Sequence, residues 1–196
     1  MKIGLVGGAF DPPHNGHRFL IETARPYFDQ IWVLPAYDHV YGKKMQKATH
    51  RLEMCRLAFV GTDAIINDYE IENQITDGTY ALIKRLIADY PQHQFGWVVG
   101  LDNANTITRW INYQKLLASI PFTVVLRTGY SDANEWYHHD PHQFILAQNL
   151  FPTISSTQIR QMIKENKKPT LIVESVYDYI RLHDLYLETE ETKETT

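Results

Sequence analysis

The chain has little of what several common classes of protein require. Its 196 residues include one cysteine, Cys55, which excludes an internal disulfide and is predicted to be a buried thiol within a helix. No apolar run approaches the ~20 residues of a membrane-spanning helix, and the N-terminus lacks a signal-peptide pattern. The formal net charge of −4 argues against a surface that coats nucleic acid. The sequence therefore predicts a cytoplasmic protein with neither a membrane nor a nucleic-acid partner.

Two widespread nucleotide-binding signatures are also missing. Gly4, Gly7 and Gly8 do not have the spacing of a G-x-G-x-x-G dinucleotide fingerprint, and no Gly-Lys-Ser/Thr tripeptide follows a strand. Hydride transfer and P-loop hydrolysis therefore lose their main support. Any anionic ligand has to be held by other local groups, because the chain has no basic excess.

Strand-like and helix-like segments alternate along most of the chain. Apolar runs predict strands at Lys2–Val6, Gln30–Pro35, Ala64–Tyr69, Gln94–Gly100 and Phe122–Arg127. Helical patterns lie between them, at Gly16–Tyr27, Thr49–Val60, Gly78–Tyr90 and Asn112–Ala118, with Thr79 at a position that suits a helix cap. This alternation predicts an α/β fold, a Rossmann-like, doubly wound parallel sheet with helices on both faces.

The last quarter of the chain follows a different pattern. Ser155–Glu165 and Val173–Leu185 are predicted to be helices of a small C-terminal piece packed on the sheet, so that residues 1–187 form one domain. The charged segment 188–196 has no apolar residue and is predicted to be a disordered tail. Tyr130–His142 is predicted to be a solvated loop rather than a metal site, despite its histidines.

The most informative stretch is Gly7–His17, which follows the first strand directly and reads Gly-Gly-Ala-Phe-Asp-Pro-Pro-His-Asn-Gly-His. Its glycines let the backbone approach a ligand, and the helix predicted to begin there offers unpaired N–H groups to an anion. His14 and His17 can donate hydrogen bonds to phosphate oxygens. A metal site would need further ligands nearby, and none is close in sequence. The stretch therefore predicts a polyphosphate site.

A second stretch, Ile154–Arg160, reads Ile-Ser-Ser-Thr-Gln-Ile-Arg ahead of a predicted helix. Its three hydroxyls and the helix N-terminus form another anion cradle, and Arg160 adds a guanidinium. An ordinary serine cap is the commoner explanation of such a segment on its own. Together with Gly7–His17, however, the segment favours phosphate binding. The loop after the fourth strand, which contains Asp102, would lie beside Gly7–His17 if both strands are central.

These two motifs resemble those of the H-x-G-H nucleotidyltransferase superfamily. Within it, the chain is most similar to the nicotinate/nicotinamide mononucleotide adenylyltransferases, and the similarity extends along most of the chain. The supporting segments are Lys43-Lys44 with His50–Met54, Gly78-Thr79, Val99–Asp102, Trp110, Arg127–Tyr130 and Val176–Tyr186. One departure is Gly78, because many bacterial relatives have an aspartate before this threonine.

The resemblance implies adenylyl transfer from ATP to a pyridine mononucleotide, with Mg²⁺ bound through the ATP phosphates and no metal site made by the protein. Its catalytic residues would be His14, His17 and Arg160. The implied ATP-binding residues are Gly8, Ala9, Phe10, His14, His17, Lys43, Gly100, Asp102, Ser155, Ser156, Thr157 and Arg160. The implied mononucleotide-binding residues are Phe10, Lys44, Thr79, Trp110 and Arg127.

Several alternatives stay open at the level of sequence. Another superfamily member, such as a pantetheine-phosphate adenylyltransferase, or a non-catalytic nucleotide sensor would share the phosphate motifs. The sequence does not decide between nicotinate and nicotinamide mononucleotide, between Lys43 and Lys44 as the phosphate contact, or between a monomer and a homo-oligomer.

Overall fold

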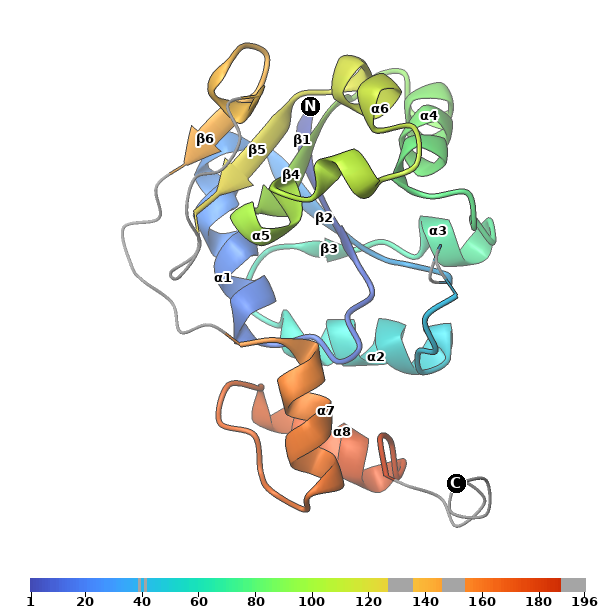
Figure 1. The fold of residues 1–196 in the computed structure, drawn as a ribbon, viewed down its shortest axis with the longest axis vertical. Helices are drawn as coiled ribbons and strands as arrows, with labels where there is room; N and C mark the ends of the chain where they lie inside the picture. Colours follow the sequence, from blue (N-terminus) through green and yellow to red (C-terminus); the bar gives the residue numbers. More distant parts are fainter. Residues whose placement is uncertain (39, 41, 127–135, 146–153, 188–196) are drawn as a thin grey trace.

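Within the part of the chain that the structure describes, six parallel strands form one sheet in the order β3-β2-β1-β4-β5-β6 (Figure 1). The computed structural model describes residues 1–38, 40, 42–126, 136–145 and 154–187. The strands are β1 (Lys2–Gly8), β2 (Gln30–Pro35), β3 (Ile65–Ile66), β4 (Gln94–Gly100), β5 (Phe122–Val125) and β6 (Gln143–Ile145). The predicted Rossmann-like α/β fold is confirmed. β1 lies at the centre and pairs with both β2 and β4.

Eight α-helices connect or flank these strands in the described residues. They are α1 (Asn15–Ala24), α2 (Ala48–Ala58), α3 (Tyr69–Glu72), α4 (Thr79–Asp89), α5 (Leu101–Ala104), α6 (Tyr113–Ser119), α7 (Ser156–Lys164) and α8 (Glu174–Leu182). Three single-turn 3₁₀ helices span Arg25–Tyr27, Ile107–Arg109 and Trp136–His138. None of the helices in the described part of the chain is long and apolar enough to cross a bilayer.

Side chains of the central strands alternate between two hydrophobic cores, as the period of two of a strand requires. On β2, Ile31 and Val33 face one core, whereas Trp32 and Leu34 face the other. The first core is closed by α1, α2, α7 and α8, and the second by α4, α5 and α6. Burial on both faces explains why these strands read as nearly continuous apolar runs.

The C-terminal helices share the first core with the sheet. Ile159 and Ile163 of α7 and Val176 and Ile180 of α8 are buried together with Val6 of β1. In Figure 1 the two helices lie beneath α2, at the same end of the molecule as the loop that follows β1. This packing places the beginning of α7 beside the Gly7–His17 segment.

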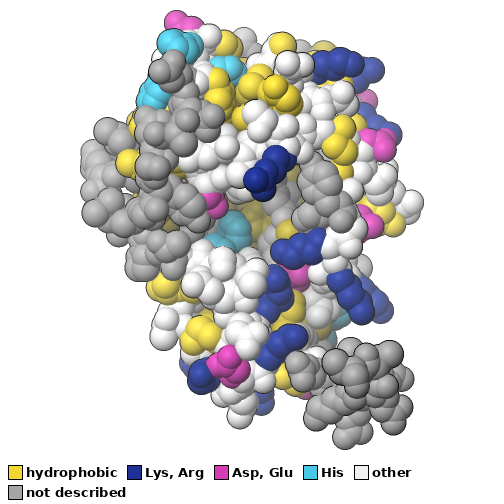
Figure 2. Space-filling view, in the orientation of Figure 1, with side chains coloured by type: hydrophobic (Ala, Val, Ile, Leu, Met, Phe, Trp, Pro, Cys, Tyr) yellow, Lys and Arg dark blue, Asp and Glu magenta, His cyan; other side chains and the backbone are white. Residues whose placement is uncertain are grey.

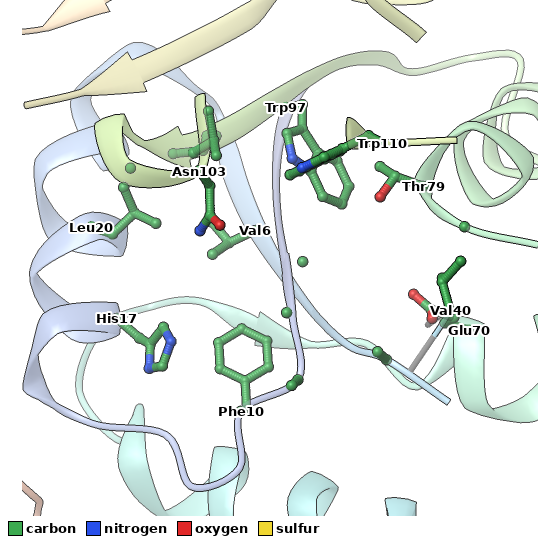
Figure 3. A pocket seen from close by; sticks show the side chains of 18 of the residues that line it. Val6, Phe10, His17, Leu20, Val40, Glu70, Thr79, Trp97, Asn103 and Trp110 are labelled. Atoms are coloured by element: carbon green, nitrogen blue, oxygen red, sulfur yellow. The ribbon is translucent and has the colours of Figure 1, made fainter. Parts of the chain in front are cut away.

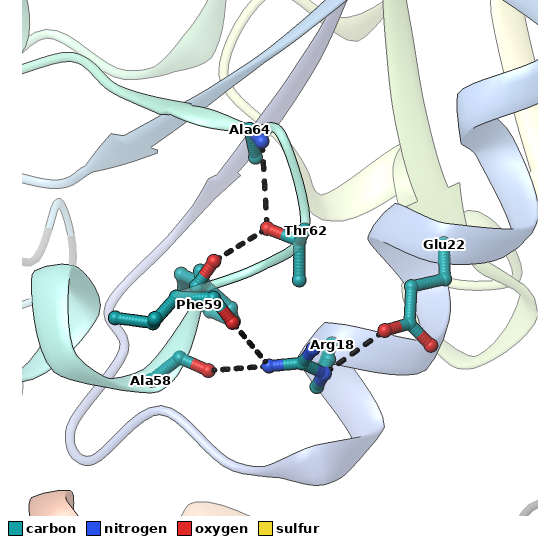
Figure 4. Close-up of polar contacts among 7 residues, drawn as sticks. Arg18, Glu22, Ala58, Phe59, Thr62 and Ala64 are labelled. Atoms are coloured by element: carbon teal, nitrogen blue, oxygen red, sulfur yellow. Dashed lines mark hydrogen bonds and ion pairs between the residues drawn. The ribbon is translucent and has the colours of Figure 1, made fainter.

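A polar tie holds α1 against the end of α2 (Figure 4). Arg18 Nη1 donates hydrogen bonds to the backbone carbonyls of Ala58, at 3.4 Å, and Val60, at 2.9 Å. Its Nε donates to Glu22 Oε1 at 2.9 Å, one turn further along α1. The helix that carries His17 is therefore anchored at its solvent side as well as through its buried face.

The structure differs from the sequence predictions at several element ends. The third strand shortens to β3, because Asn67 Oδ1 accepts a hydrogen bond from the backbone N–H of Tyr69 and turns the chain into α3. Thr79 is not the cap of α4: Gly78 takes that position with a φ of 86°, and no side chain caps the helix.

A further difference concerns the segment predicted to be a loop. Within that segment, Trp136–His138 forms a 3₁₀ turn. Directly after the predicted loop, Gln143–Ile145 forms β6 at the edge of the sheet. Three residues are too few for a strand periodicity to be recognised. Residues 130–135 of the predicted loop, the predicted tail 188–196 and Arg127 lie outside the described residues.

Candidate active site

The two phosphate motifs and the Asp102 loop meet at the carboxyl ends of β1 and β4. In the observed strand order the direction of winding reverses between these two strands, which defines a topological switch point. Ala9–His14 leaves β1 there, and α5 with Asp102 leaves β4. The prediction that the loops after β1 and β4 are neighbours is confirmed, because β1 and β4 are paired.

His14 and His17 form the N-terminal cap of α1. Nδ1 of His14 accepts a hydrogen bond from the backbone N–H of Gly16 at 3.1 Å, and Nδ1 of His17 accepts one from the N–H of His14 at 3.2 Å. The two rings stack with their centroids 3.8 Å apart. This reciprocal arrangement is a capping box in which imidazole nitrogens replace the usual hydroxyl and carboxylate.

The cap also decides which ring nitrogen carries the proton in a neutral imidazole. Because each Nδ1 accepts a backbone N–H, the proton of each neutral ring is on Nε2. Both rings line a cavity at the start of α1. The histidines can therefore stabilise the helix through one nitrogen and donate a hydrogen bond through the other.

The N-terminus of α7 is fastened to the loop between β1 and α1. Ser156 Oγ donates to the backbone carbonyl of Pro12 at 2.9 Å, and Arg160 Nη1 donates to that of Asp11 at 2.7 Å. Ser155 caps α7 in a capping box with Gln158. The alternative that this serine is an ordinary helix cap is therefore correct. The cap holds the hydroxyl segment opposite the histidines.

One cavity of about 310 Å³, here called the hydroxyl cavity, lies between these elements. It is lined by His14, Gly16, His17, Phe19, Leu20, Lys43, Gly100, Asp102, Asn103, Val125, Ile154, Ser155, Ser156 and Thr157. Two imidazoles, three hydroxyls and an ammonium group therefore surround one space beside two helix N-termini. Such a donor set suits a polyphosphate.

A second cavity of about 340 Å³, here called the aromatic cavity, extends from the same point along β1 and β4. Figure 3 shows His17 and Phe10 on one side of it, and Trp97, Trp110 and Thr79 on the other. Gly8, Ala9, Gly78 and Gly100 also line it, and His17 and Ser156 line both cavities. The two spaces are thus joined at the histidine and hydroxyl groups.

Glycine at position 7 makes room for one aromatic wall. A Cβ on Gly7 would lie 2.3 Å from Trp97 Cη2, which is far inside contact distance. Trp97 in turn meets Trp110 edge to face, with ring centroids 6.4 Å apart. The close approach of backbone and indole lets the pair of tryptophans form one end of the aromatic cavity.

A buried arginine that the sequence analysis did not single out holds the loops of the site together. Arg51 on α2 is 1% exposed. Its guanidinium donates to the backbone carbonyls of Ala9, Tyr37 and Gln46 at 2.8, 2.9 and 2.8 Å. Burial lowers the pKa of Arg51, and nearby Asp11 opposes this effect. The sequence signal was present in the His50–Met54 motif, but the motif does not show which carbonyls are bound.

Asp11 is a second buried group that the sequence analysis did not assign a role. It is 5% exposed, and its Oδ1 accepts hydrogen bonds from Tyr186 Oη at 2.7 Å and from the backbone N–H of Gln46 at 3.3 Å. Burial raises the pKa of Tyr186, and the nearby charge of Asp11 raises it further. The C-terminal end of the chain is thereby tied to the loop that carries the histidines.

The structure brings most of the predicted site residues together. Lys43 lines the hydroxyl cavity, whereas Lys44 lines neither cavity. Arg160 lines neither one; its Nη1 is bonded to Asp11 and its Nη2 to Thr157 Oγ1 at 3.1 Å. Arg160 therefore fastens α7 to the loop in this structure. Arg127 lies outside the described residues.

Several basic side chains lie near the site on one face of the molecule. Figure 2 shows Lys and Arg side chains gathered beside a hollow at whose edge a histidine is visible. No group of three or more His, Cys, Asp or Glu side chains within the described ranges is arranged to hold a metal ion. Positive side chains thus lie beside the site, although the whole chain has a net charge of −4.

Fold and site together define an α/β protein whose switch point combines imidazoles, hydroxyls and helix N-termini, a donor set that suits the phosphates of a nucleotide, instead of a P-loop. The family model described as Cytidylyltransferase-like matches residues 5–162. The match covers the carboxyl end of β1, the switch point and the beginning of α7, which contribute to both cavities.

Similar proteins narrow the assignment. A nicotinate-nucleotide adenylyltransferase from Bacillus subtilis is 31% identical over 192 residues, which cover 94% of this chain and 98% of that protein. The fold is shared with the Plasmodium falciparum nicotinic acid mononucleotide adenylyltransferase complexed with APC (TM-score 0.80, 22% identity, 94% of this chain and 96% of that one). The same enzyme complexed with NaAD superposes with a TM-score of 0.78 at 20% identity, over 94% and 97% of the two chains.

The chain therefore belongs to the nicotinate-nucleotide adenylyltransferases, within the Cytidylyltransferase-like family. The predicted family and the predicted enzyme class, a nucleotidyltransferase, are both confirmed.

Proposed function

We propose that this protein transfers the adenylyl group of ATP to nicotinate mononucleotide, forming deamido-NAD and pyrophosphate in NAD biosynthesis. The observation that carries the proposal is the junction of the two cavities at His17 and Ser156. One cavity has the donors for a triphosphate, the other has an aromatic end for a pyridine ring, and the reacting phosphates would meet between them. The names of the relatives support nicotinate mononucleotide as the acceptor.

In this proposal ATP occupies the hydroxyl cavity. His14 and His17 would donate from Nε2 to the α- and β-phosphates, while Ser155, Ser156 and Thr157, with the N-terminus of α7, would hold the distal phosphates. Lys43, which lines the same cavity, would add a positive charge. Asp102 would accept hydrogen bonds from the ribose hydroxyls. Gly100, which lines both cavities, and Gly8, Ala9 and Phe10, which line the aromatic cavity, would form the backbone and apolar walls where ATP meets the mononucleotide.

The mononucleotide would occupy the aromatic cavity. Its pyridinium ring would meet Trp110, since an electron-poor cation favours an aromatic face. Phe10 and Thr79 line the same space. We keep Arg127 and Lys44 as proposed contacts of the mononucleotide phosphate, although Arg127 is not described and Lys44 does not line the cavity.

The reaction needs no protein nucleophile. An oxygen of the mononucleotide phosphate would attack the α-phosphorus of ATP in line, and the bond to pyrophosphate would break on the opposite side. The histidines would act by positioning the α-phosphate and stabilising the charge that builds up on it. Arg160 would contribute either by holding α7 against Asp11 or by turning towards the distal phosphates once ATP binds.

Mg²⁺ fits this site as a companion of ATP. Because no cluster of acidic or imidazole ligands is found among the described residues, the ion would be held by phosphate oxygens and water, as Mg²⁺ commonly is. Bound in this way, it would neutralise charge on the α-phosphate and on the leaving pyrophosphate. The hydrogen-bond donors of this chain would bind the phosphates, and the phosphates would bind the ion.

Residues 1–187 would act as one catalytic domain. The support is the core that α7 and α8 share with the sheet, together with the hydrogen bonds from Ser156, Arg160 and Tyr186 to the loop after β1. Separating the C-terminal helices from the sheet would remove the hydroxyl side of the phosphate cradle.

Initial rates with purified protein test the proposal directly. We expect dinucleotide and pyrophosphate to form from ATP, Mg²⁺ and nicotinate mononucleotide, with nicotinamide mononucleotide and pantetheine phosphate as competing acceptors. Pyrophosphate release with pantetheine phosphate alone would overturn the proposed acceptor. Nucleotide binding without turnover of any acceptor would favour the non-catalytic sensor.

Trp110→Ala should raise the KM for the mononucleotide by about tenfold, with little change in the KM for ATP, because stacking of a cation on an indole is worth ~1–2 kcal/mol. Separate titrations of the two substrates measure this. Trp136→Ala, on the 3₁₀ turn beside β6, is a control that removes an indole away from both cavities. Equal increases in both KM values for Trp110→Ala would show that the ring is only part of the core.

A further inference from the structure

The aromatic cavity carries acidic groups at the end where the pyridine ring would lie. Among the described residues that line it, the only Asp or Glu side chains are Asp38 and Glu70, and no lysine or arginine is present. Figure 3 shows the carboxyl group of Glu70 directed into the space on the same side as Thr79 and Trp110. His17, where the phosphates would be held, is on the opposite side. A ring stacked on Trp110 would therefore direct its substituent towards an acidic wall.

Hydrogen bonding fixes Glu70 in this position. Its Oε1 accepts a hydrogen bond from the backbone N–H of Tyr37 at 3.2 Å, in the segment that follows β2. The backbone carbonyl of Glu70 accepts one from Ile75 at 3.0 Å, which holds the short helix α3 against the chain before α4. The second carboxylate oxygen is not needed for either bond. Glu70 is thus a positioned carboxyl group at the wall of a cavity rather than a mobile surface side chain.

We propose that Glu70 discriminates between the carboxylate and the carboxamide forms of the pyridine mononucleotide. This inference rests on the proposed function, because it assigns the selectivity of that same site. Nicotinate carries a carboxylate at the ring position where nicotinamide carries an amide. An ionised Glu70 would repel the first and accept a hydrogen bond from the amide N–H₂ of the second. A protonated Glu70 would instead donate a hydrogen bond to the nicotinate carboxylate.

The charge of Glu70 changes near neutral pH. Burial raises its pKa to about 7, although the Tyr37 N–H and the Arg51 guanidinium both favour the ionised form. Among the described residues, Arg51 on α2 is the charge that acts on Glu70, and Asp38 after β2 lines the same cavity. Tyr69, beside Glu70 on α3, donates its hydroxyl to Asp89 on α4. Below the pKa, Glu70 is neutral and compatible with nicotinate. Above the pKa it is a carboxylate, which lowers the preference for nicotinate over nicotinamide.

The test is the ratio of kcat/KM for nicotinate mononucleotide to kcat/KM for nicotinamide mononucleotide, measured with ATP and Mg²⁺ between about pH 6 and about pH 8.5. Both substrates carry the same phosphate, whose second pKa is about 6, so its ionisation cancels in the ratio. We expect the ratio to fall by about tenfold as the pH rises, since a like-charge contact is unfavourable at a partly buried site. A flat ratio in the unmodified protein would overturn the proposal without any variant.

Two variants locate the effect. Glu70→Gln keeps an oxygen that can accept the Tyr37 N–H and removes the charge, so its ratio should no longer depend on pH. Glu72→Gln makes the same change at an exposed position of the same helix and should keep the pH dependence. Loss of the dependence in Glu72→Gln, or its persistence in Glu70→Gln, would contradict the assignment. Failure of the proposed function looks different, because then neither mononucleotide yields a dinucleotide at any pH.

Discussion

Replacing His17 by alanine is expected to lower kcat by about 10²–10³-fold, the usual cost of removing one donor that stabilises charge in a transition state. His17 lines both cavities, and its Nδ1 is bonded to the N–H of His14, which leaves Nε2 as the nitrogen that donates. Rates at saturating ATP and mononucleotide measure the loss. The fold should survive, because the first core does not include this side chain.

A matched variant separates catalysis from capping. His17→Glu retains an acceptor at the third helical position, where glutamate is a common partner in a capping box, but its carboxylate has no donor. We expect it to melt close to the unmodified protein and to be at least as inactive as His17→Ala. Near-normal turnover in either folded variant would contradict the assigned role, and recovery of activity in the glutamate variant alone would make His17 a helix cap without a catalytic role.

Replacing Arg51 by methionine is expected to lower the free energy of unfolding by about 3–5 kcal/mol, the cost of removing one partner from a buried set of charge-assisted hydrogen bonds. Methionine preserves much of the side-chain volume but cannot donate hydrogen bonds to the carbonyls of Ala9, Tyr37 and Gln46. Denaturant unfolding measures the change. KM values for both substrates should also rise, since these carbonyls belong to the loops around the two cavities.

Arg56→Met on the same helix is the control for this substitution. Arg56 is exposed and pairs with Glu53 at 3.3 Å, so its removal should cost less than about 1 kcal/mol, as surface ion pairs do. Equal stability losses for the two variants would contradict the prediction, because the three buried hydrogen bonds of Arg51 would then stabilise the fold no more than an exposed ion pair does.

The local sequence pattern was enough to predict the bounds of strands with long, regular apolar runs. The strands β2 and β4 have the predicted bounds, because apolar runs flanked by turn residues leave little freedom. β6 was missed because its three residues gain their conformation from pairing with β5 rather than from their own pattern. Gly78 rather than Thr79 caps α4, since a φ of 86° is available to glycine at little cost.

The residues of the candidate site likewise fall into those that local motifs predict and those that they do not. His14, His17, Ser155 and Ser156 were found from sequence because helix N-termini and hydroxyl or imidazole donors are encoded within a few consecutive residues. The roles of Arg51, Asp11 and Glu70 were not found. Arg51 and Glu70 are 19 residues apart, and each acts on backbone groups of segments elsewhere in the chain. No local pattern records such partners.

The sequence by itself thus determined the α/β fold, through its periodicity, and the nucleotidyltransferase family, through the resemblance that its two short motifs carry. Only the tertiary structure decided that Lys43 rather than Lys44 lines the hydroxyl cavity, that Arg160 is bonded to Asp11, and that Glu70 enters the aromatic cavity. The physical reason is that these contacts join segments brought together by strand order and core packing, which side-chain chemistry along one segment does not specify.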